Sequence, residues 1–160
     1  MKEMFVNISG EERKILIHVL LQMQKNVENR ECRGQNSVEI IAAILVGIVA
    51  LEHLFIMILE MFFIDSKVAK RAFKLPKHLE GDRNVAIMFA NQGLYNGFLA
   101  AGLIWGLVLG LNPIGYMVQL FFVICVVVAA IFGGFTSNKS IIVKQGLPAV
   151  LALVALLCMI

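Results

Sequence analysis

Long apolar runs dominate the chain after residue 39, and short polar stretches separate them. Each of four runs is close to the length of about 20 apolar residues that crosses a bilayer. The connections between them are short apart from residues 65–87, and Asn112-Pro113 has the composition of a tight turn. The pattern predicts an all-α fold, an integral membrane four-helix bundle. Its spans are expected at about residues 40–64, 85–111, 114–135 and 141–160.

A separate helix is expected before these runs. Ser9, followed three residues later by Glu12, forms a capping box that predicts a helix start. Apolar side chains then recur at helical spacing and form one stripe, with polar residues between them. The stripe consists of Leu16, Leu20, Met23 and Val27, widened by Ile15 and Val19.

The division of the chain follows from that helix. The amphipathic pattern covers about residues 10–29, and the polar residues 29–37 that follow predict a linker. We therefore expect an amphipathic helix with its linker at residues 1–37 and a four-span membrane domain at residues 38–160.

Composition supports a membrane location. The 160 residues have a mean hydropathy of +0.84 and are 59% hydrophobic, which is more apolar surface than a soluble domain of this size buries. The spacing of Cys32, Cys125 and Cys158 fits no metal motif, so we predict no metal and no cofactor. The first 39 residues lack the apolar core of a cleavable signal peptide.

The positive charges predict an orientation, with one conflict. Six Lys/Arg lie in residues 65–87, none lies at the Asn112-Pro113 turn, and Lys139 lies in the third loop. The positive-inside rule therefore places the first and third loops in the cytoplasm and both termini outside. The segment through Glu39 also carries six Lys/Arg, which opposes this orientation, but six Glu balance them and long segments follow the rule less strictly.

Three ionisable side chains lie within the first apolar run: Glu52, His53 and Glu60. Such groups at bilayer depth are energetically costly, so by default they mark a functional site or a tight structural pair. At 100° per residue, His53 and Glu60 share one helix face, whereas Glu52 points about 100° away.

Polar side chains in the other runs complete a candidate cluster. Asn91, Gln92 and Asn96 begin the second run, and Lys144 and Gln145 begin the fourth. In the predicted orientation all five lie in the same half of the membrane as Glu60. We therefore expect a polar binding pocket open to the cytoplasm, with Glu52 and His53 at its floor and Lys144 as a counter-ion.

Purely structural readings of these residues stay open. Asn and Gln side chains often only join membrane helices, and Glu60 and Lys144 could each extend to the interface. Glu52 and His53 could form a hydrogen-bonded structural pair. Gln119 is the one strongly polar side chain of the third run. Small residues at spacing four in the second run predict close helix packing, either within the bundle or between two copies. They form two sets, Gly93 with Gly97, and Gly102 with Gly106 and Gly110.

Two resemblances cover different parts of the chain. The residues Ile8–Leu16 and Leu20–Asn26 resemble the last helix of MarR-type transcriptional regulators, although the DNA-reading winged helix is absent here. This segment is a remnant of such a regulator or an ordinary interfacial helix. The membrane domain resembles a family of small bacterial membrane proteins known only as a domain of unknown function (number 1304). The matching segments are Leu51–Phe62, Ala90–Leu103 and Val143–Ala149. This resemblance implies four spans and an inner-membrane location, and no activity.

Three classes of function remain. We favour transport or binding of a small solute or protons through the polar cluster, because its members come from at least three spans. The alternatives are a membrane-embedded enzyme with Glu52 and His53 as acid and base, and a non-catalytic membrane scaffold. An enzyme is the less favoured reading, because no second histidine and no nucleotide-binding glycine loop lies in the runs. As partners we expect the lipid bilayer and a second copy of the chain, and no nucleic acid.

Overall fold

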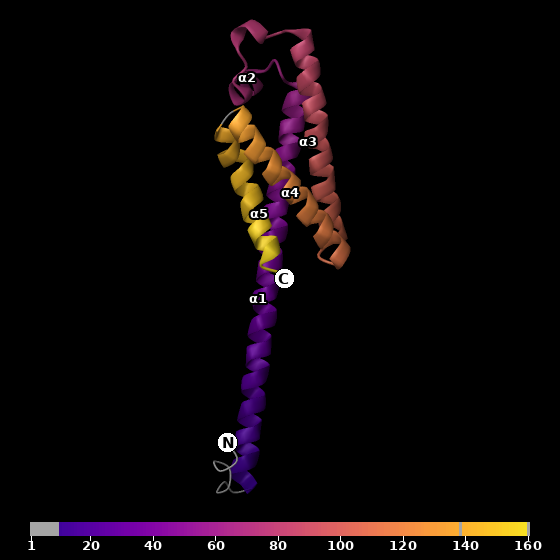
Figure 1. Cartoon of the computed structure of the whole chain (residues 1–160). Coiled ribbons are helices and arrows are strands. Elements are labelled where there is room, and N and C mark those ends of the chain that lie inside the picture. Colours follow the sequence, from indigo (N-terminus) through magenta and orange to yellow (C-terminus); the bar gives the residue numbers. More distant parts are fainter. Residues whose placement is uncertain (1–9, 138, 160) are drawn as a thin grey trace. The chain divides into compact units, whose positions relative to one another are not determined.

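The computed structural model describes residues 10–137 and 139–159, without the side chains of residues 12 and 30–33, and this part of the chain is helical with no strand (Figure 1). The prediction of an all-α fold is therefore confirmed. Ser9 and the side chain of Glu12 lie outside the described part of the chain, and the predicted capping box lies outside it with them.

The first helix, α1, runs without a break from Gly10 to Phe62. It includes residues 29–37, so the segment predicted as a linker is helical. This stretch contains no proline, and its one glycine, Gly34, costs only about 1 kcal/mol relative to alanine, which strong flanking helix overcomes. By contacts the chain divides into two units, Met1–Val38 and Glu39–Ile160, and the second contains the predicted polar cluster.

Two helices, α3 (Arg83–Leu109) and α4 (Pro113–Thr136), form an antiparallel pair. The connecting turn has the predicted Asn112-Pro113 chemistry. Asn112 Oδ1 accepts hydrogen bonds from the backbone N–H groups of Ile114 and Gly115 at 3.0 Å each. Its Nδ2 donates to the carbonyl of Leu109 at 2.6 Å, so one side chain joins the end of α3 to the start of α4.

The fourth apolar run differs from its prediction. Within the described residues, α1, α3 and α4 are long and apolar enough to cross a membrane, whereas Ile142–Leu157 is a shorter apolar helix. It begins as the π-helix η3 (Ile142–Gly146) and continues as α5 (Leu147–Leu157). Pro148 lacks a backbone N–H and cannot close the usual α-helical hydrogen bond to Lys144, which accounts for the irregular winding before it.

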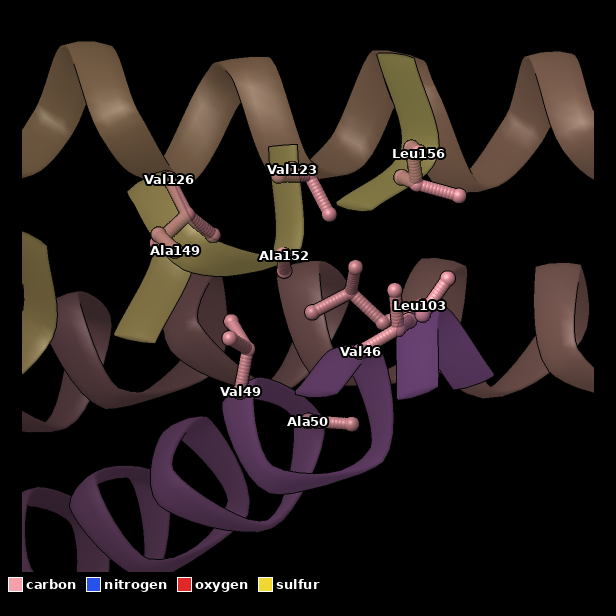
Figure 2. Close-up of a cluster of buried hydrophobic side chains, with 10 residues drawn as sticks. Val46, Val49, Ala50, Leu103, Val123, Val126, Ala149, Ala152 and Leu156 are labelled. Atoms are coloured by element: carbon pink, nitrogen blue, oxygen red, sulfur yellow. The ribbon is translucent and has the colours of Figure 1, made fainter. Parts of the chain in front are cut away.

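One apolar core joins α3, α4 and α5 to the part of α1 after Glu39. Figure 2 shows side chains from all four helices meeting around a common centre. The members are small or β-branched apart from two leucines, so the helices can approach closely. They are Ala42, Val46, Val49, Ala50, Leu103, Val123, Val126, Ala149, Ala152 and Leu156.

The glycines of α3 pack inside this unit. Gly93 and Gly97 face α1, whereas Gly102 and Gly106 face α4. A Cβ atom on Gly93 would lie 2.7 Å from Met61 Cγ, which is closer than real Cβ contacts allow. Of the two roles left open for these glycines, the structure therefore favours packing within one chain over a surface for a second copy.

Candidate functional site

The buried carboxyl group of Glu60 binds an amide on the neighbouring helix. Asn96 Nδ2, on α3, donates a hydrogen bond of 2.8 Å to Glu60 Oε2, on α1. Both side chains are buried, with 5% of Glu60 and 8% of Asn96 exposed. Gly93 makes this contact possible, because a Cβ there would lie only 3.1 Å from the backbone oxygen of Met57. Two of the predicted site residues are thus brought together.

Gln92 takes part in this contact only through its backbone. Its carbonyl oxygen accepts a weaker hydrogen bond of 3.3 Å from Asn96 Nδ2, whereas its side chain is exposed. The Asn96 amide therefore bridges Glu60 and the preceding turn of α3, which fixes the direction in which the amide points.

His53 lies buried one turn after its own hydrogen-bond partner. Its Nδ1 atom is 2.8 Å from the carbonyl oxygen of Val49, and 2% of the residue is exposed. A carbonyl oxygen only accepts, so Nδ1 carries the proton of this bond. In the neutral ring, Nε2 is then the nitrogen with the free lone pair and the atom available for proton exchange.

Glu52 is half-buried and carries an unsatisfied oxygen. Its Oε2 atom is buried and has no hydrogen-bond partner. The structural alternative of a hydrogen-bonded Glu52–His53 pair is not what the side chains form, because His53 uses Nδ1 for Val49 and Glu52 Oε2 is left alone.

The remaining predicted members are not drawn into this contact. Asn91 on α3 and Lys144 on η3 have exposed side chains, and Gln145 is half-buried. Among the described residues, no ion pair joins Lys144 to Glu52 or Glu60. The predicted counter-ion is therefore not paired with either carboxylate, because its side chain is exposed. The full eight-residue cluster stays a prediction.

Gln119 is a buried polar residue that the candidate cluster did not include. Only 1% of it is exposed, and its Nε2 donates to the carbonyls of Gly106 at 3.0 Å and Gly110 at 3.3 Å. Its Oε1 is buried without a partner. The signal that could have found this contact is a glutamine on α4 opposite small residues at spacing four on α3.

Two hollows in the surface are lined by apolar side chains, and none of the predicted polar residues borders either of them. One, of about 590 Å³, lies between α3 and α4 and includes Trp105 and Phe121 in its lining. The other, of about 260 Å³, lies between α4 and the η3–α5 segment. Among the described residues, no three His, Cys, Asp or Glu side chains are grouped so as to hold a metal ion.

Comparisons with known proteins cover the region that contains these contacts. The model of the family described as "Protein of unknown function (DUF1304)" matches residues 47–157. The chain is also 39% identical over 116 residues to "Uncharacterized protein YpaA" of Lactococcus lactis subsp. lactis, and this match covers 72% of the chain and 96% of the relative. No solved structure matches the chain. All eight predicted site residues lie inside the matched region, and the chain belongs to the DUF1304 family of proteins of unknown function.

Proposed function

We propose that this chain is a multi-pass protein of the bacterial inner membrane that binds protons or a small cation and passes them through its polar cluster. Three helices of sufficient length and apolarity support the membrane location. We place η3 and α5 as a fourth, shorter span, because they share the apolar core with α1, α3 and α4. Glu60 is the central residue of the proposed path.

The observation that carries this proposal is the environment of Glu60. Its carboxyl group is buried between two apolar helices, and an amide is its hydrogen-bond partner. Among the described residues it has no ion-pair partner. A buried carboxylate without a counter-charge is costly, and taking up a proton or a cation removes that cost. Because the Asn96 amide donates to Oε2, the other carboxyl oxygen of Glu60 is left to bind the proton or the cation.

His53 and Glu52 extend the path along α1. His53 lies two turns before Glu60 on the same helix face, about 10 Å away along the axis. The unprotonated Nε2 of its neutral ring suits a proton relay. The unpartnered Oε2 of Glu52 is a further acceptor one residue away.

A scaffold is the second candidate function, and one observation favours it. Asn96 and Gln119 each donate a hydrogen bond to a neighbouring helix, which is how polar side chains join membrane helices without further chemistry. In that case Glu60 would serve only as the acceptor for Asn96.

Flux measurements separate the two candidates. The purified full chain is reconstituted into liposomes that contain a dye sensitive to protons, to sodium or to potassium, and a gradient of the matching ion is applied. We expect dissipation of one of these gradients at a rate proportional to the protein content. Liposomes without protein give the background rate. Background rates for all three ions would reject transport and favour the scaffold.

Orientation is a separate proposal with its own measurement. We place the α1–α3 connection in the cytoplasm because six Lys/Arg lie in residues 65–87. A Lys77→Cys variant, in a chain whose three natural cysteines are replaced by serine, should react with a membrane-impermeant maleimide only after the cells are opened. Asn112→Cys, in the opposite turn, should react in intact cells. The reverse pattern would overturn the orientation.

The expectations on partners also remain proposals. We expect at least a dimer, since four spans are few for a monomeric transporter, with a surface other than the glycines of α3. The likeness of the N-terminal segment to the last helix of MarR-type regulators stays a prediction, as does the absence of nucleic-acid binding.

A further inference from the structure

The connection between α1 and α3 is a folded element. The composition of residues 65–87 predicted a basic loop, but the structure contains the helix α2 (Lys67–Phe73) and the short 3₁₀ helix η2 (Lys77–Leu79). Ser66 caps α2 by accepting a hydrogen bond of 3.1 Å from the Ala69 N–H. Lys74 ends it with a left-handed backbone, φ 53°.

A small apolar core holds α2 against the ends of the long helices. Ala69 is fully buried there, beside Leu59 at the end of α1. Phe73 of α2 packs on Phe89 of α3 with ring centroids 5.3 Å apart. The contact fixes the direction in which the remaining side chains of α2 point. Ile64 and Ala86 complete this core.

The acidic side chains of the connection serve its own structure. Glu80 pairs with Lys70 at 2.8 Å. The hydrogen bond to Glu80 raises the pKa of the Lys70 amine, and the charges of Glu80 and Asp65 act in the same direction. Asp82 caps α3 by accepting hydrogen bonds from the Asn84 and Val85 N–H groups at 2.8 and 3.1 Å. Of the three acidic side chains in residues 65–87, Glu80 and Asp82 are therefore engaged within the connection. Neither forms an ion pair with Lys67, Arg71, Lys77 or Arg83.

The cations that remain are exposed and have apolar neighbours. Lys67 and Arg71 on α2, Lys77 on η2 and Arg83 at the start of α3 have exposed side chains, and none forms an ion pair within the described residues. Three exposed apolar side chains belong to the same segment: Phe62 and Phe63 precede Lys67 in the chain, and Val68 follows it. The segment therefore combines positive charge with apolar side chains, a combination typical of the membrane interface.

We propose that this surface, formed by Lys67, Arg71, Lys77 and Arg83 with Phe62, Phe63 and Val68, binds the headgroups of anionic phospholipids. We refer to it as the α2 surface. The proposal rests on the membrane location proposed above, because α1 ends and α3 begins at this point and the surface then lies at headgroup depth. Clustered Lys/Arg next to a span attract anionic lipid, and the apolar side chains would enter the acyl region.

An acidic protein or a nucleic acid fits this surface less well. Either would match the four cations, but neither would cover Phe62, Phe63 and Val68, which are exposed at the same connection. A lipid meets both needs, because its phosphate lies next to its acyl chains. Free phosphate would engage the cations alone.

Lipid titration of the full chain tests the proposal. The chain is purified in a neutral detergent and titrated with short-chain phosphatidylglycerol or short-chain phosphatidylcholine, and bound lipid is counted by native mass spectrometry. We expect at least about tenfold tighter binding of phosphatidylglycerol. The variant Lys67→Gln/Arg71→Gln/Lys77→Gln/Arg83→Gln should lose this preference. Inorganic phosphate at the same concentration should not displace the lipid.

Two matched variants serve as controls for this experiment. Lys67→Arg/Arg71→Lys/Lys77→Arg/Arg83→Lys keeps the charge and should keep the preference. Arg13→Gln/Lys14→Gln/Lys25→Gln removes exposed cations elsewhere on α1 and should keep it too. Equal binding of the two lipids by the unaltered chain, or displacement by inorganic phosphate, would overturn the proposal. Carbonate extraction of cell membranes tests the membrane location separately. A failure of the membrane location is therefore distinguishable from a failure of the lipid-binding proposal.

Discussion

Replacing Glu60 by glutamine is expected to reduce ion flux through the reconstituted protein to the rate of protein-free liposomes. Glutamine keeps the length and shape of the side chain, and its amide oxygen can accept the hydrogen bond that Asn96 Nδ2 now donates at 2.8 Å. The variant therefore removes the group that takes up a proton or a cation while it preserves the contact between α1 and α3. The liposome flux assay described above measures the result directly.

The matched control is the replacement of Tyr95 by phenylalanine. Tyr95 lies beside Asn96 on α3, but its side chain is exposed and it is not a member of the polar cluster. We expect unchanged flux in this variant. Retention of the unaltered rate by Glu60→Gln, at equal protein content, would contradict the transport proposal and leave Glu60 as a structural acceptor.

Replacing Asn96 by leucine separates structure from chemistry at this contact. It leaves Glu60 Oε2 without its hydrogen bond, and an unsatisfied buried polar group costs about 1–3 kcal/mol. Unlike Glu60→Gln, this variant should therefore lower the stability of the protein as well as change its flux. Comparing the stability of the two variants therefore shows whether Glu60→Gln loses flux while it stays folded.

Local patterns in the sequence were sufficient to predict the long helices and the turn between α3 and α4, but not the short helices α2 and η2. Apolar runs of membrane length and the Asn112-Pro113 pair depend on residues that are near in sequence, so no knowledge of packing is needed. Residues 29–37 show the limit of that reasoning. Their polar composition predicted a break, but helix on both sides continues through them.

Partners between helices were harder to predict. The helical period placed His53 and Glu60 on one face of α1, yet it could not say which residue of α3 would meet Glu60. Close approach at Gly93 selects Asn96 over its neighbours Asn91 and Gln92. Lys144 was expected to pair with a glutamate, but its side chain is exposed.

The close contact of α3 with α4 leads to the second large expected effect. Replacing Gly106 by alanine should destabilise the fold by about 2–4 kcal/mol. The added Cβ would lie 2.6 Å from Gln119 Cγ and 3.0 Å from the Gln119 backbone nitrogen, so the backbone of α4 has to move. That movement would also lengthen the 3.0 Å hydrogen bond from Gln119 Nε2 to the Gly106 carbonyl.

Gly47→Ala provides the matched control for Gly106→Ala. A Cβ at Gly47 would have Leu107 Cδ1 as its nearest neighbour, at 4.0 Å, which is an ordinary contact. Alanine also has the higher helix propensity, so this variant should be as stable as the unaltered protein or slightly more stable. Unfolding by added SDS in mixed micelles, followed by far-ultraviolet circular dichroism, gives both values. Equal stability of the two variants would contradict the close packing of α3 on α4.

A double variant identifies which atoms cause the loss. Gly106→Ala/Gln119→Ala removes Gln119 Cγ and with it the shorter of the two clashes, and it also removes the buried Oε1 that has no partner. The approach of 3.0 Å to the backbone nitrogen remains. We therefore expect the double variant to be more stable than Gly106→Ala and less stable than the unaltered protein. Additive losses from the two single variants would instead mean that Gly106 and Gln119 act independently, because residues in contact should show coupled effects.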